Sequence, residues 1–115
     1  MNQKDFDVIL EDVIKNIREI LGNKGIEYSS DKDRLYNFRR CADILHITNE
    51  RALLGFAMKH FISILDMIEG LPDKIPSEKK IDEKLVDMIN YIILLIALLK
   101  ERINKNEDEK RIKKK

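Results

Sequence analysis

The chain has little of what marks disulfide-bonded, nucleic-acid-binding or membrane-spanning proteins. Cys41 is the only cysteine among 115 residues, which excludes an intrachain disulfide and a cysteine-rich zinc site. The formal net charge is only +1, so no global field attracts nucleic acid or an acidic membrane. The longest apolar run covers residues 91–99, well short of the roughly 20 residues that span a bilayer.

Helix breakers are scarce as well, since the sequence has only two prolines and four glycines. It has no tryptophan, and 43% of its residues are hydrophobic and 37% are charged. This mixture is typical of a small helical protein with a sharply divided surface, and no segment alternates like a strand. The sequence therefore predicts an all-α fold, a four-helix bundle-like single domain over residues 1–104 followed by a charged C-terminal tail over residues 105–115.

Hydrophobic residues at three- and four-residue spacing predict two helices in the first half of the chain. The first runs from about Lys4 to Leu21, and Gly22 with Asn23 is expected to end it. Residues 22–33 are interpreted as a connection, and a second helix is expected over about residues 33–45. The start of the chain lacks the basic and apolar regions of a signal peptide, so we expect a soluble, cytoplasmic protein.

Two further helices follow, each with a capping residue. Thr48 is a good N-cap for a helix over residues 49–69, because its side-chain oxygen can accept an orphan amide hydrogen of the first turn, and Gly70 is expected to end that helix. After the two prolines, Ser77 can cap the last helix, over about residues 78–104. The charged tail either extends this helix or frays.

The last helix is expected to lie in an interface between chains. Its segment 91–99 is apolar all round, with Leu94, Leu95, Leu98 and Leu99 on arcs that three partner helices would struggle to cover. A two-fold partner would cover them with its own copy. We therefore expect a homo-oligomer, at least a dimer, that forms through the C-terminal helix.

Polar residues form a stripe along each of the last two helices. At 100° per residue, five of them share about a third of the third helix, namely Lys59, His60, Ser63, Asp66 and Met67. On the fourth helix Glu83, Asp87 and Asn90 share an arc that Leu94 and Leu98 continue. A stripe that begins polar and ends apolar is partly buried, and partly buried charged groups are where ligands and chemistry usually sit. The alternative is an exposed lysine and a histidine that makes one hydrogen bond at the edge of the core.

The acids on these stripes also permit a metal site. Asp66 with Glu69 and Asp87 with Asn90 form D-x-x-E and D-x-x-N pairs, whose oxygens could hold Mg²⁺ or Mn²⁺. This layout is similar to that of the all-α nucleoside triphosphate pyrophosphatases of the MazG and dimeric dUTPase kind, which carry E-x-x-E and E-x-x-D. The present chain has fewer charges. The structural alternative is a set of solvated acids and one buried Asp–Asn pair.

The second helix carries the one compact basic and aromatic cluster, in which Arg34, Arg39 and Arg40 alternate with Tyr36 and Phe38. Guanidinium groups bind phosphate with bidentate geometry, and an aromatic face can stack on a base. The alternative is plain surface charge.

Four sequence blocks, in order from residue 24 to residue 99, resemble a family of small phage and prophage proteins. The blocks surround Glu27-Tyr28, Arg34-Leu-Tyr-Asn37-Phe38-Arg39, Lys59-His60-Phe-Ile-Ser63-Ile-Leu-Asp66-Met67, and Glu83-Lys84-Leu-Val-Asp87-Met-Ile-Asn90-Tyr91. Related phage families are described as nucleotide-modification-associated. The resemblance implies a cytoplasmic accessory protein of a bacterial host and a ligand site at the matching residues: Tyr28, Arg34, Asn37, Arg39, Lys59, His60, Ser63, Asp66, Asp87, Asn90 and Tyr91.

Three functions follow from these observations. The leading hypothesis is a protein that binds a phosphorylated nucleotide-like molecule. Its concrete version is the sequestration of a host defence signalling nucleotide. This protein would need no cofactor and would have no membrane or nucleic-acid partner. The second is a pyrophosphohydrolase for nucleoside triphosphates, with Asp66, Glu69, Asp87 and Asn90 around Mg²⁺ or Mn²⁺. The third is a protein-interaction inhibitor of a host factor, in which the polar stripes serve only the fold.

Overall fold

The structure is a computed structural model that describes residues 1–24 and 35–114. Within these residues the chain is helical and contains no strand, which confirms the all-α prediction. The elements are α1 (Gln3–Arg18), a π-helical turn η1 (Glu19–Lys24), α3 (Tyr36–Leu45), α4 (Asn49–Glu69) and α5 (Glu78–Lys114). Two predicted site residues, Tyr28 and Arg34, lie outside the described residues.

The first helix begins where expected but does not end there. Asn2 caps it, because the side-chain oxygen accepts a hydrogen bond from the Asp5 amide at 2.8 Å. The predicted stop at Gly22 and Asn23 is wrong, since the helical turns continue through η1 to Lys24. A glycine ends a helix by adopting the left-handed conformation, and Gly22 does not have a positive φ.

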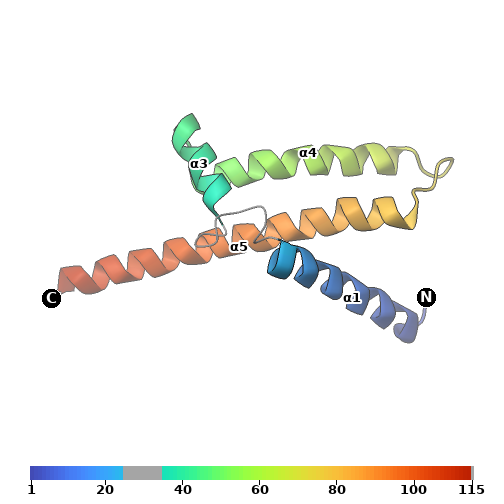
Figure 1. Cartoon of the computed structure of the whole chain (residues 1–115), viewed down its shortest axis with the longest axis horizontal. Helices are drawn as coiled ribbons and strands as arrows, with labels where there is room; N and C mark the ends of the chain where they lie inside the picture. Colours follow the sequence, from blue (N-terminus) through green and yellow to red (C-terminus); the bar gives the residue numbers. More distant parts are fainter. Residues whose placement is uncertain (25–34, 115) are drawn as a thin grey trace.

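Helices α4 and α5 form a long antiparallel hairpin, the centre of the fold (Figure 1). Both predicted caps are confirmed: Thr48 Oγ1 accepts from the Arg51 amide, and Ser77 Oγ accepts from the Lys80 amide, each at 3.2 Å. The bounds of α4 agree with the prediction, and Gly70 follows its last residue. The charged tail continues α5 as helix to Lys114, so α5 is about 55 Å long at 1.5 Å per residue.

The core lies where α3, α4 and α5 meet. Leu35, Leu53 and Leu98 are buried together, and Phe38, Tyr91, Leu94 and Leu95 pack against them. Leu98 is only 1% exposed in a single chain. Of the four leucines that were expected to exceed the cover of one chain, Leu98 is therefore buried and Leu94 and Leu95 pack against the core, whereas Leu99 is 47% exposed.

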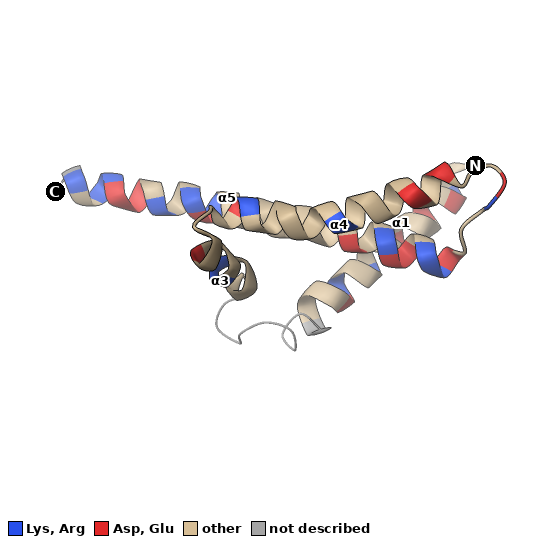
Figure 2. Cartoon of the chain, turned by 90° about the horizontal axis from the view of Figure 1, so that it is seen from above, with Lys and Arg blue, Asp and Glu red and all other residues tan. Residues whose placement is uncertain are grey.

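The two remaining helices flank the hairpin. Helix α3 packs on α4, and α1 packs on α5. In Figure 2, α3 and the C-terminal end of α1 lie on the same side of the α4–α5 pair. None of the helices in the described part is long and apolar enough to cross a membrane.

Candidate functional site

Helices α4 and α5 bring polar side chains together near the middle of the hairpin. We call this group the polar cluster; its members are His60 and Ser63 of α4 and Lys84, Asp87 and Tyr91 of α5, together with Asn90, which stands about one helical turn after Asp87. The Lys84 ammonium donates a hydrogen bond to Ser63 Oγ. His60 Nδ1 lies 3.9 Å from Asp87 Oδ2, and the His60 ring lies 5.0 Å from the Tyr91 ring at an interplanar angle of 48°. Five of these six residues were predicted as site residues, and Lys84 was not.

Lys84 could have been found from its position alone. It stands three residues before Asp87, so both side chains lie on adjoining parts of the helix surface. Lys84 belongs to the last of the four sequence blocks, although it was not among the predicted site residues. In the structure its hydrogen bond to Ser63 joins the polar stripe of α5 to that of α4, as does the His60–Asp87 contact.

Burial changes the acidity of two members of the polar cluster. The pKa of Asp87 is raised, mainly because partial burial disfavours the carboxylate; the Glu83 charge raises it further, and His60 opposes the shift. The pKa of Tyr91 is also raised, first by burial and then by the nearby Asp87 charge. Both shifts have partial burial as their main cause, so these two side chains lie where water is partly excluded.

Asn90 is the most buried polar residue of the cluster. It is 6% exposed, and neither its Nδ2 nor its Oδ1 has a hydrogen-bond partner among the residues that the structure describes. Leaving a buried donor or acceptor unsatisfied costs about 1–3 kcal/mol. Such a side chain is explained when a ligand or an ordered water supplies the missing partners.

Lys59 and Asp66 do not join the cluster. Both are exposed on α4, about 100–120° of helix rotation from His60 on the Ser63 side. Glu69 is exposed at the last turn of α4. Over residues 1–24 and 35–114, no three His, Cys, Asp or Glu side chains are close enough to hold a metal ion. The predicted metal set of Asp66, Glu69, Asp87 and Asn90 is therefore not assembled within one chain.

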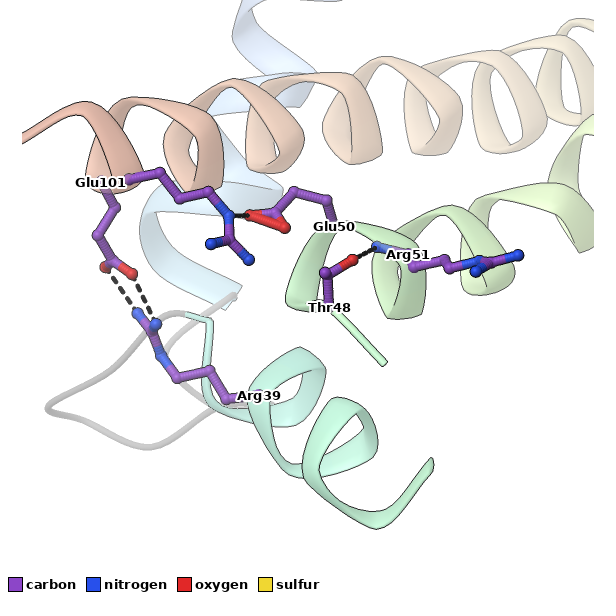
Figure 3. Close-up of polar contacts among 6 residues, drawn as sticks. Arg39, Thr48, Glu50, Arg51 and Glu101 are labelled. Atoms are coloured by element: carbon purple, nitrogen blue, oxygen red, sulfur yellow. Dashed lines mark hydrogen bonds and ion pairs between the residues drawn. The ribbon is translucent and has the colours of Figure 1, made fainter. Parts of the chain in front are cut away.

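The arginines of α3 have different surroundings. The Arg39 guanidinium donates to both carboxylate oxygens of Glu101, at 2.6 and 2.7 Å (Figure 3). This bidentate pair gives Arg39 a structural role. Glu50, at the start of α4, accepts a hydrogen bond from Arg102 at 2.5 Å, and this bond lowers the pKa of Glu50.

A groove of about 600 Å³ is lined by residues of α3 and of the hairpin on which α3 packs. Its lining is mainly apolar and aromatic, with one basic and one amide side chain: Asn37, Phe38, Arg40, Cys41, Ile44, Leu45, Phe56 and Tyr91. The Phe38 and Phe56 rings meet edge to face, with centroids 5.7 Å apart. Tyr91 belongs to this lining and to the polar cluster, so the two features are continuous. Arg40, which was seen in the basic cluster but left out of the predicted site, lies at this groove.

In comparisons with known proteins, no family model, no curated protein and no solved structure matches the chain.

Proposed function

We propose that the protein binds a phosphorylated, nucleotide-like small molecule in the groove beside Tyr91. The observation that carries the proposal is the position of Tyr91, which connects the hydrogen-bonding groups of the polar cluster to an aromatic groove containing Arg40. Ligand sites in proteins are mostly apolar concavities of about 300–1,000 Å³ with a few convergent polar groups. The groove and the polar cluster together have this composition and size.

Each part of such a ligand has a chemically suited neighbour. The Arg40 guanidinium can bind a phosphate through two parallel hydrogen bonds. Tyr91 and Phe38 offer aromatic faces on which a base can stack. Asn90 has unused donor and acceptor capacity for a sugar hydroxyl or a base edge. Arg39, which was first assigned to phosphate, is replaced in this proposal by Arg40 because Glu101 already binds it.

The protein would act as a homo-oligomer of at least two chains. In the phage setting that the sequence resemblance implies, the ligand would be a signalling nucleotide of the host's defence, and binding would remove it from its receptor. This role needs tight binding of the nucleotide and no turnover. Hydrogen-bonding and stacking groups, which the proposed site contains, are the groups that binding requires.

The test is calorimetry with a panel of mono-, di- and cyclic nucleotides at micromolar concentration. At least one should bind, and Arg40→Ala should weaken that binding about tenfold or more, since a charge-assisted hydrogen bond contributes about 1.5–3 kcal/mol. The matched control is Arg111→Ala, on the exposed C-terminal part of α5. No binding by any nucleotide, or equal losses in both variants, would refute the proposal.

The other two hypotheses predict different outcomes of the same kind of experiment. Incubation with Mg²⁺ or Mn²⁺ and each deoxynucleoside triphosphate would release pyrophosphate if the chain were a pyrophosphohydrolase. A bound nucleotide recovered unchanged by mass spectrometry supports the binder. An interaction inhibitor would keep its full biological activity in the Arg40→Ala variant, whether or not the substitution weakens nucleotide binding.

A further inference from the structure

One face of the α4–α5 hairpin carries two apolar stripes at heptad spacing. We call it the open face; its residues are Leu54, Met58, Phe61, Leu65 and Ile68 of α4 and Leu85, Ile92, Ile96, Leu99 and Ile103 of α5. On α4 the steps alternate between four and three residues, as do those of α5 once the half-buried Ile89 is included. All ten side chains are between 37% and 57% exposed. Alternating steps of three and four are the spacing of helices that pack along their length.

The two stripes lie on the same side of the hairpin. On α4, Leu53, Ala57 and Ile64 are buried along the line facing α5, and the stripe lies about 80° of rotation further in the direction of increasing residue number. On α5 the stripe lies about 130° beyond the line facing α4, marked by Tyr91 and Leu98, in the same direction. Because the helices are right-handed and antiparallel, the same sense of rotation leads to the same side of the pair.

The flanking helices occupy the opposite side. Helix α3 contacts α4 through the Phe38–Phe56 pair, and Phe56 lies in the other rotational direction from the line facing α5. The buried Val86 and Asn90 of α5 lie in that opposite direction too. Figure 2 agrees, since α3 and the C-terminal end of α1 fall on one side of the hairpin. The polar cluster and the groove are on that covered side, so the open face is separate from the candidate site.

The exposed area is larger than that of a compact monomer of this mass. The chain exposes 9395 Å², whereas a folded monomer of 13.6 kDa exposes about 6,600 Å². Its radius of gyration is 17.8 Å, against about 13 Å for a globular chain of this length. The charged end of α5 accounts for part of the excess. The total excess, about 2,800 Å², is more than three times the roughly 800 Å² that each partner buries in a standard interface.

We propose that the open face is buried against the open face of a second copy of this chain, in a two-fold symmetric dimer whose core is a four-helix bundle. A second copy suits this surface because it supplies the same pair of antiparallel heptad stripes, and isologous interfaces reuse one patch. Between Leu54 and Ile68 and between Leu85 and Ile103, charged residues lie beside the two stripes and not on them; the nearest is Lys100, about 40° of rotation from Ile96. Charged side chains would therefore lie at the edge of the interface. The two grooves would face outward, one on each side of the dimer.

The test measures the oligomeric state without ligand, so its outcome is independent of the proposed binding function. Sedimentation or light scattering of the wild type should give twice 13.6 kDa, and Ile96→Glu should reduce this mass to that of the monomer. The matched control is Ile112→Glu, which places the same charge on an exposed residue of α5 outside the open face. A wild-type monomer at high micromolar concentration, or an Ile96→Glu variant that remains dimeric, would overturn the proposal.

A second measurement covers the case in which Ile96→Glu unfolds. The urea midpoint of a wild-type dimer should rise with protein concentration, because mass action favours the associated state. A midpoint that is unchanged over a hundredfold range of concentration would overturn the dimer. If the open face instead binds a different protein, the wild-type chain alone would be monomeric, and that result also contradicts the proposal.

Discussion

Arg39 and Glu101 join the short helix α3 to the middle of α5 through two hydrogen bonds of 2.6 and 2.7 Å between residues 62 positions apart. This pair fixes the helix that forms one wall of the groove. It also explains why neighbouring arginines have different roles, since Arg39 positions α3 and Arg40 remains at the groove.

A double-mutant cycle would measure this coupling. Arg39→Ala and Glu101→Ala should each lower the free energy of unfolding by up to about 1 kcal/mol, because both side chains are partly exposed and the pair is screened by solvent. The double variant should lose less than the sum of the two. Urea denaturation at low and high salt provides the measurement, and a coupling energy near zero in low salt would show that the pair does not hold α3.

Substitutions in the buried and in the exposed part of α5 should differ in their effect on stability. Leu98→Ala should lower the free energy of unfolding by about 2–5 kcal/mol, since Leu98 is packed among the buried leucines of α3 and α4. Ile112→Ala, at a side chain that is 74% exposed, should change it by less than about 0.5 kcal/mol. Equal effects of the two substitutions in urea denaturation would contradict the packing around Leu98.

The raised pKa of Asp87 predicts how stability depends on pH. A carboxyl whose pKa is higher in the folded chain than its usual 3.8 binds its proton more tightly when folded. Its favourable contribution is therefore complete below pH 3.8 and is lost as the pH rises through the raised pKa. Asp87→Asn should remove this loss, so that the variant gains stability relative to wild type as the pH rises through that window.

Urea denaturation at a series of pH values would check the Asp87 prediction. Asp82→Asn is the matched control, because Asp82 is an exposed acid on the same helix. The difference between Asp87→Asn and wild type should grow with pH and then level off. A difference that is constant, or that shrinks as the pH rises, would show that the folded chain does not disfavour the Asp87 carboxylate.

Local signals in the sequence predicted most of the helical structure. Thr48 and Ser77 have capping side chains, and their caps depend only on residues three positions away. Gly22 misled the prediction because glycine permits a left-handed stop without requiring one. The length of α5 was also left open, because the charged residues after Asn104 are compatible with either a solvated helix or a frayed end.

The candidate site was harder to predict, because it depends on contacts between helices. Helical periodicity placed Lys59, His60 and Asp66 on one stripe, but the position of α5 decides which part of a stripe is covered. His60 faces Asp87, whereas Lys59 and Asp66 lie further round the helix and remain exposed. Likewise, nothing local distinguishes Arg39 from Arg40, and only the long-range partner Glu101 separates them.

Asn90 should show a trade-off between stability and binding. Its buried amide has no partner among the described residues, so Asn90→Leu exchanges an unsatisfied polar group for an apolar one of similar volume. The variant should gain about 1 kcal/mol in the free energy of unfolding. It should also lose binding of any nucleotide that the wild type binds, because the amide would no longer complete the ligand's hydrogen bonds.

Thermal or urea denaturation and calorimetry on the same preparation measure both effects of Asn90→Leu, with the exposed Asn104→Leu as control. A destabilised Asn90→Leu variant would mean that the amide is already satisfied in the unliganded chain, and a stabilised variant with unchanged affinity would place the ligand elsewhere.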